Sequence, residues 1–260
     1  MHFVEFYRDY AAHDRAYDKF KTADFSAGRR SEDERRFLRF MLSTMNAHLW
    51  MAQQFAALSL KDENRGNIVI MWVMQESRCV ELLGRMLCEP DPFPRIPEEL
   101  IGSISAYDQH AEIFAHFGVH ALALSLIFRH AGAGRTPDPA LKEAYEWIAG
   151  ALALERRYCF EELRTLLDFD PARPELVRRT IAGMKTPGQE LFEGYEAGAL
   201  SALKSRASRA LLKELAREAR EIPGVGGDLW PLIQPHLARF GVSRLKQLAA
   251  RAVLAAVSWN

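Results

Sequence analysis

Residues 68–87 read IVIMWVMQESRCVELLGRML, an apolar run that carries a carboxylate, Glu76, near its middle. Four apolar side chains stand at the three-, four- and seven-residue offsets that share a helical face with it: Trp72, Val73, Val80 and Leu83. We therefore predict a buried helix over 67–88. A carboxylate in such surroundings must be hydrogen-bonded, protonated or bound to a cation, because an unpaired buried charge is too costly to keep. Glu76 is the first candidate functional residue.

Capping and turn signals divide the rest of the chain into further helices. Ser31-Glu32-Asp33-Glu34 has the form of a capping box, with Ser31 as N-cap and Glu34 reaching back. Asp138 before Pro139 is the signal for another helix start. The predicted helices lie at 2–22, 31–60, 67–88, 103–131, 139–168, 174–184, 188–221 and, as two short pieces, 228–257. A polar break separates the second from the third at 61–66, and no strand-like alternation appears.

The long helices pair into two hairpins, 31–60 with 67–88 and 103–131 with 139–168. Residues 89–97 join the hairpins and hold four prolines, which no helix interior tolerates. This order outlines a four-helix bundle with one long connection. We expect an all-α fold in one helical domain over 1–260, with a four-helix core at 31–168 and a C-terminal helical extension at 174–260.

Composition and charge indicate which binding partners and which cellular location to expect. The 260 residues include 34 basic and 34 acidic side chains, so no net field favours nucleic acid or a membrane surface. We find no signal peptide and no uninterrupted apolar run long enough to span a membrane, and we expect a cytoplasmic protein. The three cysteines fall in helical patterns, which predicts reduced thiols. No pattern of a nucleotide-binding loop, a serine triad or a zinc finger is present.

Antiparallel partners in a hairpin lie at equal distances from the turn, which predicts what faces Glu76. With the first turn centred near residue 63, the facing position is near Trp50, with Asn46 and His48 within one helical turn. Polar side chains are therefore expected to meet a buried carboxylate in the middle of the first hairpin.

The second hairpin has the same character. With its turn centred near residue 135, Glu155 lies opposite Ala115 and close to Glu112 and His116. Polar side chains at four-residue steps line that helix: Asp108, Glu112, His116 and His120. Such a ladder either binds a transition metal or relays protons, or forms an exposed polar face.

Two short strings contain the two acids, Gln75-Glu76-Ser77-Arg78-Cys79 and Glu155-Arg156-Arg157-Tyr158. They resemble the second helix of each hairpin in bacterial di-iron proteins of the ferritin-like superfamily, which carries Glu-x-x-His, often within Gln-Asp-Glu-x-Arg-His. Cysteine and tyrosine stand here where that superfamily has histidine. Its opposing helices each carry a single glutamate, and Asn46 is near the first of these places.

The resemblance implies a nonstandard metal centre for iron or manganese. Its predicted ligands are Glu76, Glu112, His116 and Glu155, with His48 and Cys79 as further candidates. It equally implies a degenerate member that has kept the bundle and lost the metals.

Tryptophan and methionine in the first hairpin suggest an adaptable apolar pocket, although most such stripes are ordinary core. We predict that Trp50, Trp72 and Tyr158 line a substrate pocket. The protein would then oxidise or hydroxylate a small organic substrate. The alternative is a metal-free accessory or scaffold subunit of a multicomponent oxygenase-like complex. In either case we expect a homo- or hetero-oligomer, and the run 203–221 suits a partner helix or a dimer contact.

Overall fold

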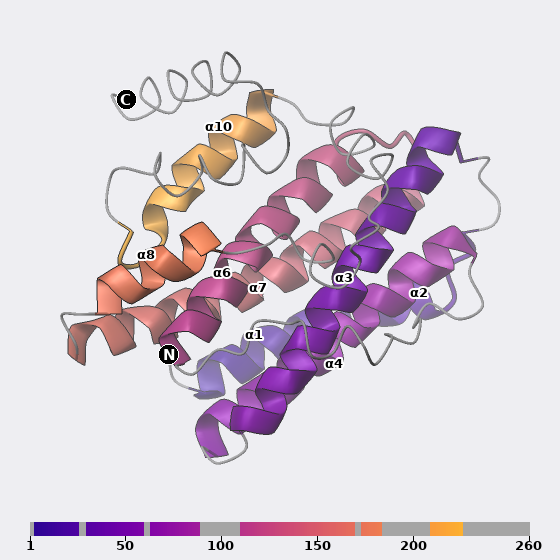
Figure 1. Ribbon diagram of the computed structural model, residues 1–260. Coiled ribbons are helices and arrows are strands. Elements are labelled where there is room, and N and C mark those ends of the chain that lie inside the picture. Colours follow the sequence, from indigo (N-terminus) through magenta and orange to yellow (C-terminus); the bar gives the residue numbers. More distant parts are fainter. Residues whose placement is uncertain are drawn as a thin grey trace, which may run out of the picture.

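The computed structural model describes residues 3–25, 30–59, 63–88, 110–169, 173–183 and 209–225, and this part of the chain is helical and contains no strand. Two long helix pairs dominate it (Figure 1). They are α3 (Glu32–Ser59) with α4 (Glu63–Leu87), and α6 (His110–Ile127) with α7 (Pro139–Phe169). Helix α4 packs against α7 and so joins the two pairs. The predicted all-α fold is confirmed, and both hairpins form.

Both capping signals mark helix starts. Ser31 Oγ accepts a hydrogen bond of 3.1 Å from the backbone N–H of Glu34, and Asp138 Oδ1 accepts one of 2.9 Å from that of Ala140. The Glu34 side chain is buried and contacts α7. It accepts a 2.5 Å hydrogen bond from the Tyr145 hydroxyl and so ties the start of α3 to α7.

Two predicted boundaries were wrong. Helix α4 begins at Glu63 rather than after the polar stretch 61–66, since polar side chains in a first turn can face water without breaking the helix. The N-terminal helix is divided into α1 (Phe3–Arg15) and α2 (Asp18–Lys21). The break lets both Tyr17 and Phe20 reach the ring of Trp147 on α7, with centroid distances of 5.0 and 6.1 Å.

Helix α6 is the central helix. It continues as a π-helix, η1 (Phe128–Ala133), so the helical stretch ends two residues beyond the predicted boundary at 131. By length and composition alone His110–Ala133 would pass for a membrane span, with a mean hydropathy of 1.6, yet 78% of the stretch tested is buried inside the fold. This burial is what the core helix of a soluble protein shows. The predicted helix residues 103–109 lie outside the described residues.

The C-terminal helices pack on α6. They are α8 (Arg173–Gly183), which agrees with the prediction at 174–184, and α10 (Arg209–Glu218) with the 3₁₀ turn η2 (Ala219–Glu221). Val177 and Leu211 belong to the same apolar cluster as Phe114 of α6. Of the leucines predicted to face a partner helix, Leu211 is therefore covered by the chain itself, and Leu215 packs partly buried against the same cluster.

Several predicted regions lie outside the described residues: the crossover 89–97, the start of 188–221 and the pieces in 228–257. The extents proposed for a single domain, a core at 31–168 and an extension at 174–260 stay predictions.

Gly118 sets how closely α6 approaches α7. A Cβ atom at this position would lie 2.6 Å from Cε1 of Phe160 and 3.1 Å from Cβ of Cys159, both buried. We expect Gly118→Ala to lower the free energy of unfolding by about 1–3 kcal/mol, the usual cost of overpacking, despite the better helix propensity of alanine.

Urea denaturation measures this effect. The matched control is Gly183→Ala, since no described residue lies within 4 Å of a Cβ at that position, and a change of less than about 0.5 kcal/mol is expected there. An unchanged midpoint for Gly118→Ala would contradict the close α6–α7 approach.

Candidate metal centre

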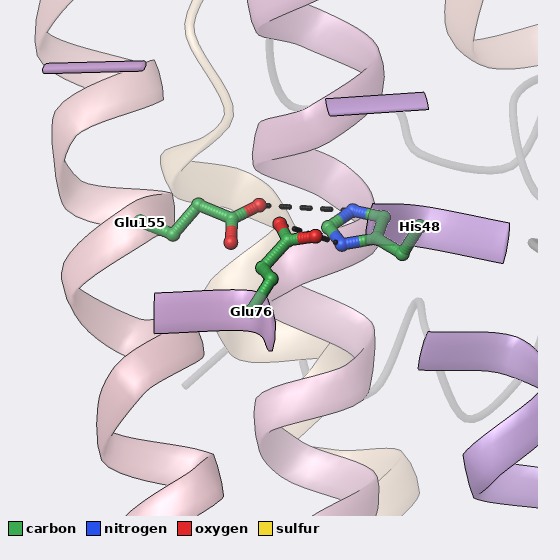
Figure 2. Close-up of side chains that lie close together, drawn as sticks. All are labelled: His48, Glu76 and Glu155. Carbon is green, nitrogen blue, oxygen red and sulfur yellow. Dashed lines mark ion pairs between the residues drawn. The ribbon is translucent and has the colours of Figure 1, made fainter. Parts of the chain in front are cut away.

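Three buried side chains from three helices converge in the core (Figure 2). His48 comes from α3, Glu76 from α4 and Glu155 from α7, with exposed fractions of 0%, 2% and 4%. Nδ1 of His48 lies 3.0 Å from Oε1 of Glu76, and Nε2 of the same ring lies 3.6 Å from Oε1 of Glu155. One ligand-type atom from each residue lies within 4.8 Å of the other two. This spacing suits three ligands around one ion.

Aromatic rings enclose the group. The ring of Phe117 lies 5.1 Å from the His48 ring and 4.7 Å from that of Trp72, centroid to centroid. Phe55 packs on both Trp72 and Phe117. The helix pairs therefore deliver the three polar groups into an apolar, water-poor space, where electrostatic interactions are strong.

The pKa of Glu155 lies well above its ordinary value. Burial is the main cause, the negative charge and close carboxyl group of Glu76 add to it, and the indole of Trp72 acts in the opposite direction. Two carboxylates this close cannot both stay charged without a counter-ion. In the metal-free protein Glu155 therefore keeps its proton.

The group also contains polar atoms without well-formed hydrogen bonds among the described residues. These are both carboxylate oxygens of Glu76, both ring nitrogens of His48, and Oε1 of Glu155. Each such buried atom costs about 1–3 kcal/mol unless another group satisfies it. Carboxylate oxygens and imidazole nitrogens are ligands that iron, manganese and zinc accept, so the donor set fits a divalent cation.

Two more imidazoles extend the polar group along α6. His116 and His120 are 0% and 5% exposed, and their ring centroids lie 4.0 Å apart. The His120 ring lies 5.8 Å from that of His48. Burial, helped by the neighbouring His48, lowers the pKa of His116 to about 3 and keeps its ring neutral. The polar side chains at four-residue steps on this helix were predicted either to bind a metal or relay protons, or to form an exposed face. Because both histidines are buried, the exposed face is wrong for them.

The remaining predicted ligands are placed differently. Glu112 is half-buried one turn before His116 and does not belong to the three-residue group. Cys79 is buried, and burial, together with the nearby acidic groups of Glu76 and Glu155, raises the pKa of its thiol. The described part of the chain does not include Asp108.

On α3, His48 and not Asn46 faces Glu76. The Asn46 side chain donates a 3.1 Å hydrogen bond to the carbonyl of Leu42 in its own helix. The predicted facing position at Trp50 is two residues from His48, and Trp50 is only half-buried. The sequence predicts His48 as a further candidate ligand, and its position within one helical turn of the facing point is the signal that marks it.

The three predicted pocket residues belong to one apolar cluster, in which Trp72 and Tyr158 are buried and Trp50 is partly buried. Trp72 lies beside Glu155 and acts on its pKa. Tyr158 is buried in an apolar cluster, with ring centroids 5.2 Å from Phe6 and 5.9 Å from Phe114.

Fold and site together define the class: an all-helical protein with a buried histidine and two buried glutamates that could bind a metal ion. No family model matches the chain, and no curated protein or solved structure matches it either. A narrower class must therefore be argued from residues and geometry.

Proposed function

We propose that the protein is a ferritin-like oxidoreductase that binds iron or manganese at His48, Glu76 and Glu155 and oxidises or hydroxylates a small organic substrate. The observation that carries the proposal is the convergence of these three buried groups from three helices, with polar atoms that make no well-formed hydrogen bond within the described part of the chain. Two helical hairpins that direct ligands into a shared core are also how the ferritin-like superfamily builds its metal sites.

The chain's own residues would perform three tasks. His48 offers a nitrogen lone pair, and the two glutamates offset the charge of a divalent cation. Binding would displace the proton of Glu155, so affinity should increase with pH. Phe117 and Trp72 exclude water from the group. The bound metal would supply the redox chemistry, which no side chain here provides.

Of the predicted pocket residues, Trp72 is the best placed to contact a substrate, because it lies beside Glu155. A cytoplasmic location and an oligomeric state belong to the proposal as well.

The test is elemental analysis of the full chain purified from cells supplemented with iron and manganese. We expect stoichiometric metal in the wild type and its loss in Glu155→Gln and His48→Ala. Glu146→Gln, which alters an exposed carboxylate of α7, is the matched control and should retain the metal. Oxygen consumption by the iron(II)-loaded protein, absent in Glu155→Gln, would support the oxidative activity. A wild-type protein without metal would contradict the proposal.

A second candidate is a metal-free accessory subunit of a multicomponent oxygenase-like complex. It is favoured by the raised pKa of Glu155, because a protonated Glu155 can lie beside Glu76 without an ion between them, and by the 3.0 Å contact that His48 already makes with Glu76. Absence of metal, together with a stable complex with a catalytic subunit in size-exclusion chromatography, would favour this function.

A further inference from the structure

The two histidines of α6 have a geometry of their own. They stand four residues apart in His116-Phe117-Gly118-Val119-His120, so both side chains lie on one face of the helix. Their rings meet nearly at right angles, with an interplanar angle of 72° and centroids 4.0 Å apart. Two histidines at this spacing on one helix chelate zinc in well-characterised helical motifs.

The pair is separate from the three-residue group. Neither histidine of α6 belongs to the set of atoms within 4.8 Å that His48, Glu76 and Glu155 form. His120 nevertheless lies only 5.8 Å from the His48 ring, and Phe117 contacts both His48 and His116. The two sets of donors are therefore neighbours in one core.

We propose that His116 and His120 chelate a second divalent cation, of the zinc, cobalt(II) or copper(II) class, beside the His48–Glu76–Glu155 site. This goes beyond the proposed function, because it uses neither carboxylate as a ligand.

The donor chemistry decides the class of ion. Imidazole nitrogen suits zinc, copper and nickel, whereas magnesium, calcium and manganese prefer oxygen. Both rings are buried, which favours the neutral form that has a lone pair to donate.

Cobalt(II) titration of the metal-free full chain tests the proposal. Visible absorption and metal retained after gel filtration should show two equivalents in the wild type. His116→Gln and His120→Gln should each keep only the ion at the His48–Glu76–Glu155 site. Glu155→Gln should keep only the ion at the histidine pair. His130→Gln is the control, since this half-buried histidine of η1 pairs with Glu214 instead, and it should retain both equivalents.

A measurement on the wild type alone keeps the test valid even if the histidine variants fail to fold. Pulsed electron paramagnetic resonance of the wild type loaded with copper(II) should show an ion coupled to two imidazoles. A spectrum in which no ion is coupled to two imidazoles would overturn the pair.

The titration also separates the two proposals. A single wild-type equivalent that His116→Gln leaves unchanged would overturn the second site. A single equivalent lost in both Glu155→Gln and His116→Gln would overturn it too, because the histidines would then serve the first ion. A single equivalent lost in His116→Gln but retained in Glu155→Gln would support the pair and contradict the proposed function.

Discussion

Glu76→Leu is expected to abolish metal binding and to leave the metal-free protein as stable as the wild type or more stable. Glu76 is 2% exposed, and neither of its oxygens makes a well-formed hydrogen bond among the described residues. It also crowds the carboxyl group of Glu155. Replacing a buried ionic group by an apolar one of similar volume is often neutral or stabilising by about 1–4 kcal/mol.

Thermal denaturation with and without iron(II) or manganese(II) measures both effects. A ligand at a hundred times its dissociation constant stabilises the folded state by about 2.7 kcal/mol. The wild type should gain this increment, and Glu76→Leu should gain none. Glu146→Leu, at an exposed position of α7, should behave as the wild type does. A large loss of stability in metal-free Glu76→Leu would instead show that the 3.0 Å contact between His48 and Glu76 holds the hairpin together.

Local signals were sufficient for the helices but not for the register between them. Ser31 and Asp138 mark helix starts through hydrogen bonds to nearby backbone N–H groups, so the sequence alone identifies them. Counting from the turn placed the partner of Glu76 near Trp50, and the structure has His48 there. One helical turn holds 3.6 residues, and the tilt between packed helices shifts their register by about as much. Counting residues from the hairpin turn therefore identifies the helical turn that faces Glu76, but not the residue within it.

The exposure of His120 could not be predicted for a related reason. Helix α6 is apolar on nearly all sides, so its sequence does not distinguish a face toward the core from a face toward water. Helix α6 packs against α7, α8 and α10, and the His120 ring lies 5.8 Å from that of His48 on α3, so the burial of both histidines depends on neighbouring helices. The burial of the two α6 histidines therefore follows from the tertiary structure and could not be predicted from the helix sequence.

The same aromatic packing that stabilises the fold also positions the ligands, and Phe117 connects the two roles. Its side chain is 2% exposed, and its ring contacts those of His48, Trp72 and Phe55 at 5.1, 4.7 and 6.1 Å. Phe117→Ala should lower the free energy of unfolding by about 3–5 kcal/mol, the usual cost of removing a buried aromatic ring.

Metal affinity should fall in the same variant. The cavity left by the ring would adjoin polar atoms that lack hydrogen bonds, and water enters such polar cavities. His48 would lose the ring that fixes its orientation, and losing the support of a ligand typically costs 10–100-fold in affinity. Competition with a chelator of known affinity measures the dissociation constant.

Phe128→Ala separates the two effects. Phe128 is 0% exposed, but it lies in η1 against Tyr145, eleven residues along the chain from Phe117 and about 16 Å farther along the helix. It should cost similar stability in urea denaturation and leave the dissociation constant for metal unchanged. If both variants weakened metal binding equally, the loss would reflect general loosening of the core. A loss confined to Phe117→Ala would instead identify this ring as the contact that holds His48 in place for the ion.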